Sequence, residues 1–324
     1  QVVRDLVTTP YGANPVVDDL LDHAILVLIP SQNPDGRFRG TRANTNGFDM
    51  NRDLLVQSQS EIKINVAFQH EWLAPVGLAM HGYVDPTLID GLTNTVITGA
   101  ERRGKYLLLP LDSGDVLMIH LRMSGQVLLA AEGATRPAHT HVVLHLDSGA
   151  EVWFVDPRTF GEVVVFAPDR AEIELPSVAR LGVDPIAEPF DRAILASIVR
   201  SRNRALKPLL LDQTAIAGIG NIYADEILHR ARLRPDRSSS TLDGRAITRL
   251  HAAIVDILTA AIAVGGSTLG DAQYVDLMGE SGSYQDDHCV YGRTGERCVT
   301  CGRGWIRRTV SGGRSTHFCP VCQR

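Results

Sequence analysis

Four cysteines near the end of this 324-residue chain constrain its fold more than any other feature. They form two Cys-x-x-Cys pairs with 17 residues between the pairs: Cys298 and Cys301, then Cys319 and Cys322. Each pair brings two sulfurs to one tight turn, and two such turns supply the four corners of a tetrahedral zinc site. Because four thiolates leave no ligand position for water, the spacing predicts one structural Zn²⁺ ion. The alternatives are a redox pair or two disulfides, which a cytosolic chain would not keep oxidised.

The charge of the chain is distributed unevenly. The net charge is −5, yet the last 37 residues carry seven arginines against a single acid, Glu296. A basic segment favours polyanionic partners, although a merely solvated tail has the same composition. The longest apolar run, Ala24 to Pro30, is far shorter than the ~18 residues of a membrane span, so we expect no membrane partner and a cytoplasmic location.

Hydrophobic patterning divides the chain into four regions. Residues 1–91 show the βαβ rhythm of an α/β fragment. Residues 92–175 contain short apolar or alternating runs, separated by Asp-Ser-Gly turns, which predict an antiparallel β-sandwich. Residues 190–285 carry apolar residues at helical spacing, most regularly from Ile247 to Ala261, and residues 288–324 hold the four-cysteine hairpin. The expected strands cover 105–111, 116–123, 126–131, 141–146, 151–156 and 162–166.

The predicted fold is an α+β multidomain protein. It comprises a truncated α/β fragment, an antiparallel β-sandwich, a helix-two-turns-helix layer and a C-terminal zinc-finger hairpin, with a proline-bearing connector at 176–189. Within the helical layer, Gly218-Ile219-Gly220-Asn221 connects two helices. The two glycines permit a close backbone approach, and the free N–H groups that begin the second helix suit a phosphate. The alternative is a tight corner in which Asn221 only caps the helix.

Five motifs of residues 92–324 stand in the order and approximate spacing of one known family. They are RRGKYLL at 102–108, HLRMSG at 120–125, VDPRTFG at 155–161, LKPLLLDQTAIAGIGNIYADEIL at 206–228, and the terminal four-cysteine segment. This part of the chain resembles the formamidopyrimidine-DNA glycosylase and endonuclease VIII family, and its formamidopyrimidine branch more closely. The resemblance implies excision of oxidised purines such as 8-oxoguanine from damaged double-stranded DNA, followed by strand scission at the abasic site. It also implies a monomer associated with the bacterial nucleoid.

The same resemblance assigns roles to individual residues. Lys105 and Arg314 would act in proton transfer during elimination. Such enzymes flip the damaged nucleotide out of the duplex and fill the vacated space, and Met123, Arg158 and Phe160 stand at the filling positions. Without the flanking motifs, ordinary core packing would be the preferred explanation of Met123 and Phe160.

Further residues would bind the DNA backbone, according to the resemblance. The phosphates near the lesion would be held by His139, Arg202, Asn221 and Arg314. Cations that neutralise phosphates release counterions, so binding should weaken steeply with salt. The zinc hairpin would then serve to present Arg314 rigidly, because a metal stabilises a short hairpin that has no core of its own.

One part of the family pattern is missing from this sequence. The family nucleophile is the amine of an N-terminal proline, and a glutamate follows this proline in the sequence. The amine attacks the sugar C1′, expels the base and forms an iminium. The sequence opens with Gln1, and it contains no Pro-Glu-Leu-Pro-Glu segment. We therefore expect DNA binding to be retained and base excision to be lost or impaired, with residual lyase chemistry conceivable through Lys105.

Residues 24–91 resemble a different family, the zinc carboxypeptidases. The motifs are IPSQNPDGR at 29–37, RANTNGFDMNRD at 42–53 and LAMHGYVDPTLID at 78–90. The resemblance implies that Asn51 and Arg52 bind a peptide carboxylate and that His81 binds zinc. However, no His-x-x-Glu occurs in the chain, and one imidazole cannot hold a catalytic zinc. The chain thus combines motifs of two families, as a chimera would. One alternative interpretation is a metallocarboxypeptidase. The other is a fused or misassembled reading frame that retains only DNA binding.

Overall fold

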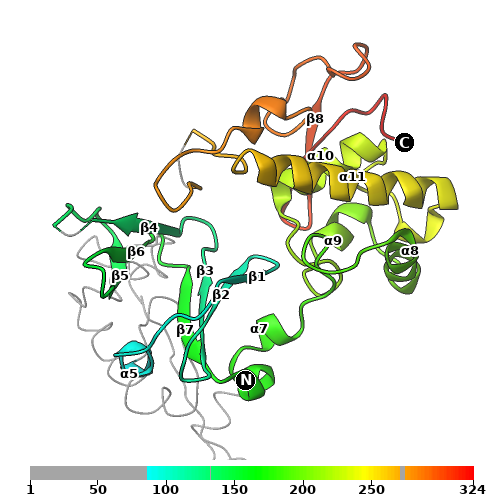
Figure 1. Cartoon of the computed structure of the whole chain (residues 1–324). Helices are drawn as coiled ribbons and strands as arrows, with labels where there is room; N and C mark the ends of the chain where they lie inside the picture. Colours follow the sequence, from blue (N-terminus) through cyan, green and yellow to red (C-terminus); the bar gives the residue numbers. More distant parts are fainter. Residues whose placement is uncertain (1–85, 132, 271–273) are drawn as a thin grey trace, which may run out of the picture. The chain divides into compact units, whose positions relative to one another are not determined.

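A computed structural model describes residues 86–131, 133–270 and 274–324 of the chain (Figure 1). Residues 79–324 form one compact unit. The predicted α/β fragment lies outside the described residues up to residue 85, together with Asn51, Arg52 and His81.

Two antiparallel sheets form the predicted β-sandwich. The four-stranded sheet has the order β1-β2-β3-β7 and the three-stranded sheet the order β4-β6-β5. The strands are β1 Glu101–Arg103, β2 Tyr106–Pro110, β3 Val116–His120, β4 Gln126–Ala130, β5 Thr140–His145, β6 Glu151–Val155 and β7 Glu162–Phe166. Strands β2 to β7 confirm the six predicted strands. Strand β1 was not predicted, because three mostly charged residues carry no apolar pattern.

Strand β3 packs both against the other sheet and against the helices that follow the sandwich. Its side chains alternate between two faces: Leu117 and Ile119 enter the core between the sheets, whereas Met118 points to the opposite side. There Met118 packs in a cluster with Leu181 and Ala217, which belong to the connector and the helical layer. A strand buried on both faces reads as a continuous apolar run, and the sandwich is thereby packed against the helices that follow.

Short helices connect the sandwich with the helical layer. Their bounds are α5 Pro86–Leu92 before the sandwich and η4 Pro168–Arg170, α6 Ala171–Glu174 and α7 Pro176–Ala179 after it. The helical layer contains α8 Arg192–Ser201, α9 Leu206–Leu210, α10 Asn221–Ala231, η5 Ser239–Thr241 and α11 Gly244–Ala263. The segment 176–189, predicted only as a connector, therefore begins with a helical turn.

Helix α11 is the central element of this layer. Asp243 caps its N-terminus by accepting a hydrogen bond from the Ala246 N–H at 2.7 Å. Gly265 and Gly266 follow its end with φ values of 73° and 80°, which confirms the predicted stop. Among the described residues, α11 is the one helix with the length and apolar composition of a membrane span. Its apolar residues, including Leu250 and Ile254, lie in the core that α8, α9 and α10 share.

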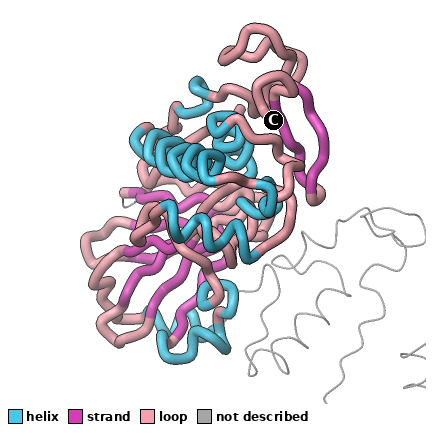
Figure 2. The backbone as a smooth tube through the Cα atoms, turned by 90° about the vertical axis from the view of Figure 1, so that its right-hand side faces the viewer, coloured by secondary structure: helices cyan, strands magenta, loops and turns pink. Residues whose placement is uncertain are grey.

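The finger closes the chain as a two-stranded hairpin. Helix η6 Tyr284–Asp287 precedes it, and its strands are β8 Arg307–Ser311 and β9 Arg314–Phe318. The hairpin and the C-terminus lie together beside the helical layer (Figures 1 and 2). The cluster of buried residues in the finger is small and includes Val290, Cys298, Ile306 and Cys319, so its order depends on the cysteine cluster.

Candidate nucleic-acid interface

The turn between β1 and β2 carries Lys105 into contact with the helical layer. Gly104 has φ of 60°, a left-handed conformation that favours glycine, and its N–H donates to the Asp184 carboxylate at 2.7 Å. The Arg102 guanidinium donates to the same carboxylate at 2.9 Å. With the turn fixed in this way, Lys105 Nζ donates to the Ile219 carbonyl oxygen at 2.9 Å. The hairpin lysine therefore meets the predicted glycine turn.

The environment of Lys105 favours its neutral form. Burial, and to a smaller extent the positive charge of Arg314, lowers the pKa of Lys105 to about 8. An ordinary lysine has a pKa of about 10.4. Lys105 can therefore exchange a proton near neutral pH, whereas an ordinary lysine would remain charged.

Asn221 joins the finger to the same place. Its side-chain Nδ2 donates to Ser315 Oγ at 3.4 Å, next to Arg314 at the start of β9, while its Oδ1 is buried and has no hydrogen-bond partner among the described residues. Gly220, with φ of −104° and ψ of 176°, is the N-cap of α10, and Asn221 is the first residue inside the helix. The alternative in which Asn221 caps the helix is therefore wrong. Residues from the sandwich, the helical layer and the finger meet around this turn.

A buried ion pair under this turn is not evident from the sequence pattern. Lys207 Nζ lies 2.6 Å from Asp225 Oδ1, and both side chains are fully buried. Lys207 also donates to the Ser315 carbonyl oxygen at 2.6 Å, and Asp225 accepts the His317 N–H at 2.8 Å. Burial lowers the pKa of Lys207, and the Asp225 charge opposes this shift. The signal in the sequence that could have indicated this ion pair is the position of Lys207 within an apolar run.

The loop that contains the VDPRTFG motif is organised by Asp156. This fully buried carboxylate accepts the N–H groups of Arg158, Phe160 and Gly161 at 3.1, 2.8 and 2.7 Å. Burial alone would raise the pKa of Asp156, but these hydrogen bonds and one from Ser124 hold it below its usual value. The Arg158 guanidinium lies 5.1 Å from the centre of the Phe160 ring. The loop therefore presents Arg158 and Phe160 as a pair.

The remaining predicted contact residues of the sandwich lie at its surface. Met123 is 48% exposed, so core packing does not explain it, whereas Phe160 is half-buried. His139 is exposed and adopts a φ of 66°, and its carbonyl oxygen accepts the Asp156 N–H at 3.0 Å. His139 is thus attached to the Asp156 loop.

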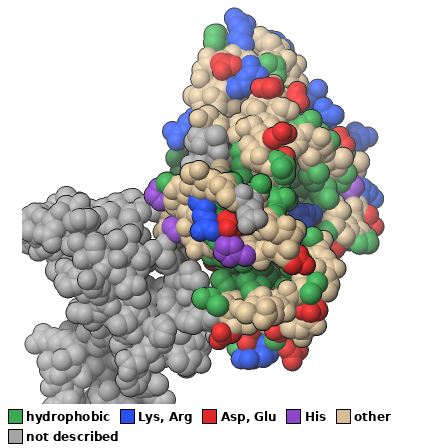
Figure 3. Space-filling view, turned by 60° about the vertical axis from the view of Figure 1, so that its left-hand side comes forward, with side chains coloured by type: hydrophobic (Ala, Val, Ile, Leu, Met, Phe, Trp, Pro, Cys, Tyr) green, Lys and Arg blue, Asp and Glu red, His purple; other side chains and the backbone are tan. Residues whose placement is uncertain are grey.

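Arg202 is engaged within the protein. Its guanidinium lies 3.1 Å from the Asp212 carboxylate, which also binds Arg204 at 2.7 Å. A groove of about 390 Å³ extends from this ion-pair cluster to the finger hairpin. It is lined by Arg204, Pro208, Leu211, Asp212, Ser311, Gly312 and Arg314. Arginine side chains recur over the finger at the top of the view in Figure 3.

His120 belongs to this region although no role was predicted for it. Its ring stacks on Tyr106 at 4.4 Å, and its Nδ1 is buried with no hydrogen-bond partner in the part of the chain that the structure describes. Burial, with the charges of Arg122 and Lys105, lowers the pKa of His120 to about 4. A neutral imidazole with a free ring nitrogen therefore lies near Lys105. Its position as the first residue of HLRMSG was the signal.

The four cysteines form the predicted zinc site. The sulfurs of Cys298 and Cys322 are 3.7 Å apart, and those of Cys301 and Cys319 are 3.8 Å apart. Zn–S bonds of ~2.3 Å place tetrahedral sulfurs ~3.8 Å apart, so the cluster fits one structural zinc ion. A Cβ at Gly304 would lie 2.5 Å from Cys319 Sγ, which explains the glycine at this position.

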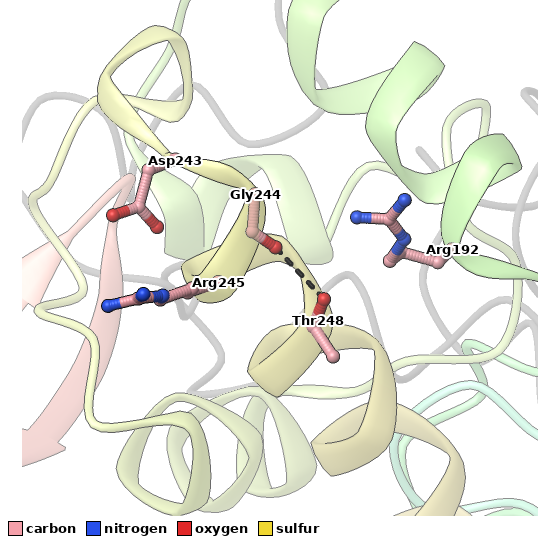
Figure 4. A pocket seen from close by; sticks show the side chains of 5 residues that line it. All are labelled: Arg192, Asp243, Gly244, Arg245 and Thr248. Carbon is pink, nitrogen blue, oxygen red and sulfur yellow. Dashed lines mark hydrogen bonds between the residues drawn. The ribbon is translucent and has the colours of Figure 1, made fainter.

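A second pocket lies apart from the predicted site residues. Its volume is about 420 Å³, and Figure 4 shows its five lining residues: Arg192 at the start of α8, and Asp243, Gly244, Arg245 and Thr248 at the start of α11. Thr248 Oγ1 donates to the Gly244 carbonyl oxygen at 2.9 Å. None of these five residues is a predicted DNA-contact residue. The candidate interface therefore centres on the Gly218–Gly220 turn, whose Ile219 carbonyl accepts the hydrogen bond from Lys105.

Three family models match the chain in succession. Residues 73–163 match the formamidopyrimidine-DNA glycosylase N-terminal domain, residues 181–273 match its H2TH domain, and residues 295–324 match a zinc finger found in FPG and IleRS. A formamidopyrimidine-DNA glycosylase of Pelotomaculum thermopropionicum is 46% identical over 224 residues, which are 69% of this chain and 79% of that protein. The chain belongs to the formamidopyrimidine-DNA glycosylase family.

Other members of the glycosylase family agree with this assignment. The enzyme of Rhodopseudomonas palustris is 44% identical over 251 residues and covers 72% of this chain and 85% of its own length. A Lactococcus lactis Fpg complex with DNA containing an abasic site matches with a TM-score of 0.67 and 37% identity, over 74% of this chain and 86% of that chain. MutM in complex with DNA containing carbocyclic 8-oxo-G matches with a TM-score of 0.66 and 36% identity, over 74% and 85% of the two chains.

These findings bear on the front of the chain as well. The glycosylase N-terminal model begins at residue 73, so residues 78–90, which carry part of the carboxypeptidase resemblance, lie within the glycosylase match. None of these comparisons supports the carboxypeptidase resemblance.

Proposed function

We propose that this chain is a DNA repair protein of the glycosylase family that binds duplex DNA containing oxidised purines such as 8-oxoguanine or abasic sites, and that it acts most strongly at abasic sites. The observation that carries the proposal is the meeting of Lys105, Asn221 and Arg314 around the Gly218–Gly220 turn. The relatives named formamidopyrimidine-DNA glycosylase, and the similar structures with lesion-bearing DNA, support it. We place this activity in the bacterial cytoplasm, near the nucleoid, and assign it to the monomer.

The chemistry of the turn suits a phosphate and an adjacent sugar. Arg314 supplies a permanent charge, and Asn221 supplies an amide at the first turn of α10, where N–H groups are free to bind an anion. Lys105, with its pKa lowered to about 8, can accept or deliver a proton during elimination. In this proposal His139 and Arg202 hold further phosphates, and Arg202 exchanges the Asp212 carboxylate for DNA.

The loop residues suit the space that a flipped nucleotide leaves. Flipping costs a few kcal/mol of stacking, which side chains inserted into the duplex offset. Exposed Met123 and the paired Arg158 and Phe160 are the groups we assign to this insertion. Arg158 also offers donors to the orphaned base, and the Phe160 ring can wedge the base step.

We also propose that base excision is weaker than strand scission in this chain. Lys105 is an amine whose pKa is lowered to about 8, so part of it is neutral and nucleophilic near neutral pH. An amine close to an abasic aldehyde can form an imine, and Lys105 is such an amine. Elimination at an existing abasic site would then persist without cleavage of the sugar–base bond.

Two duplexes test the proposal, one with 8-oxoguanine and one with a preformed abasic site. We expect both to be bound in dilute salt, with borohydride trapping and scission on the abasic duplex only. The K105Q variant should lose scission and retain binding. If the zinc-loaded protein binds neither duplex, the proposal is refuted. A covalent adduct between the 8-oxoguanine duplex and an amine in residues 1–91 would refute the claim that base excision is impaired. One zinc ion per chain is expected, since two would indicate the peptidase alternative.

A further inference from the structure

We propose that His229 is a positioning residue of the zinc centre, whose imidazole Nε2–H donates a hydrogen bond to the thiolates of Cys298 and Cys322. His229 lies on α10 and is 3% exposed. Its Nε2 is 3.5 Å from Cys298 Sγ and 3.8 Å from Cys322 Sγ. The four-cysteine spacing concerns the cysteines alone and assigns this histidine no role.

The direction of the hydrogen bond follows from the chemistry of the metal site. Four cysteines complete a tetrahedral zinc centre, so His229 is not needed as a ligand. A metal-bound thiolate has lone pairs and no proton, so the imidazole must be the donor. Zinc with four thiolates carries a net charge of −2, and an N–H group directed at two sulfurs stabilises that charge. Outer groups of this kind orient the ligands of a metal and tune its affinity.

The position of His229 on α10 connects the metal with the candidate interface. Asn221, Asp225 and His229 are spaced four residues apart and therefore share one face of the helix. Asn221 binds Ser315 and Asp225 binds His317, both on strand β9 of the finger. The α10 face thus holds strand β9 at one end and the metal centre at the other.

Glu226 reinforces this attachment from the neighbouring position. Its carboxylate accepts the N–H groups of three consecutive residues at the start of the finger, Cys289, Val290 and Tyr291, at 2.9, 3.0 and 2.8 Å. These bonds fix the entry of the finger onto α10 independently of the metal. Among the contacts of the described residues, His229 is the helical side chain that reaches the zinc ligands themselves.

Zinc release tests this inference without DNA. The full-length protein and the H229F variant are mixed with a chromogenic chelator, and zinc transfer is followed over time. We expect H229F to release zinc roughly 10- to 100-fold faster, the usual effect of removing an outer-shell partner. H229Q should restore most of the retention, because its terminal amide reaches the place of Nε2, whereas H229N is too short. The Gln and Asn variants keep the test valid if H229F does not fold.

Two controls separate this role from general destabilisation. His251 is a half-buried histidine on α11 whose Nε2 donates a hydrogen bond to the Phe190 carbonyl oxygen at 2.9 Å. This contact lies within the helical layer and not in the finger. The H251Q variant should therefore release zinc at the wild-type rate. In the cobalt-substituted protein, H229F should shift the thiolate-to-metal charge-transfer band and preserve the d–d bands of a tetrathiolate site. Equal zinc release by H229F and wild type, equal acceleration by H251Q, or d–d bands of a nitrogen ligand in wild type would each overturn the inference.

Discussion

The β-sandwich and the finger each bring a cation to the same turn, but different forces hold the two regions. Lys105 stands on a hairpin whose sheets bury Leu117, Ile119 and Phe154 between them. Arg314 stands on a hairpin whose strand β8 is largely exposed and whose cluster of buried residues is small. The first region is stabilised by apolar burial, and the second by a metal and by polar contacts with α10.

This difference suggests how a rigid site can be assembled from unequal parts. A short hairpin cannot bury enough apolar surface to order itself, so a metal and hydrogen bonds must supply the missing stabilisation. The sandwich needs no such help. The two regions should therefore respond to different perturbations, even though both serve one site.

Removal of zinc should have the largest effect and should affect only the finger. Structural zinc contributes on the order of 10–16 kcal/mol of apparent binding free energy in small fingers. We expect a strong chelator to abolish binding to a duplex with an abasic site and leave the thermal transition of the sandwich in place. Readdition of zinc should restore binding. Loss of both regions together would show that the finger and the sandwich are one cooperative unit.

A core deletion should have the next largest effect and should act on the sandwich. Leu117 is fully buried, so L117A should lower the free energy of unfolding by about 2–5 kcal/mol. The matched change in the finger is V310A, at a side chain that is 64% exposed, and it should stay within about 0.5 kcal/mol. Urea unfolding followed by circular dichroism measures both. Similar losses for the two variants would contradict the distinction between the regions.

Substitution of Arg314 should weaken DNA binding without affecting either core. We expect R314A to lower the affinity roughly 10- to 100-fold, since hydrogen bonds to charged groups contribute ~1.5–3 kcal/mol. Its slope of log affinity against log salt should fall by roughly 0.9. Arg200, an exposed arginine of α8 outside the site, provides the control R200A. Equal effects of the two variants in a salt titration would remove Arg314 from the interface.

The pH dependence of lyase chemistry should show the smallest effect. Because the pKa of Lys105 is lowered to about 8, its neutral amine becomes more abundant as pH rises through that value. The rate of imine trapping on an abasic duplex should therefore increase with a midpoint near 8. R314Q removes the neighbouring positive charge and should move the midpoint upward. A midpoint unchanged in R314Q would show that Arg314 does not act on Lys105.

The strands and the metal site could be predicted because their patterns are local. Strand β3 and its neighbours are continuous apolar or alternating runs bounded by Asp-Ser-Gly turns. The zinc ligands repeat one short spacing twice. Strand β1 and helix α7 escaped prediction because each is too short for a periodic pattern.

The polar core of the site could not be predicted because its partners are distant in sequence. Lys207 and Asp225 are charged residues, which are rarely fully buried, and their contacts extend to Ser315 and His317 in the finger. The sequence also left open whether Asn221 caps α10. Asparagine is a frequent cap, but the extended backbone of Gly220 places the helix start one residue later than a cap at Asn221 would require.

The Asp184 carboxylate has a consequence for how a duplex could be accommodated. It accepts hydrogen bonds from Gly104 and Arg102 of the sandwich and from Ile186 and Ala187 of its own segment. Opening a hinge there would remove the Gly104 and Arg102 donors from a buried carboxylate, which is costly. We therefore expect the β1–β2 hairpin and the Asp184 segment to keep their relative position when DNA binds. Any bending needed to fit the two molecules together would then occur in the duplex.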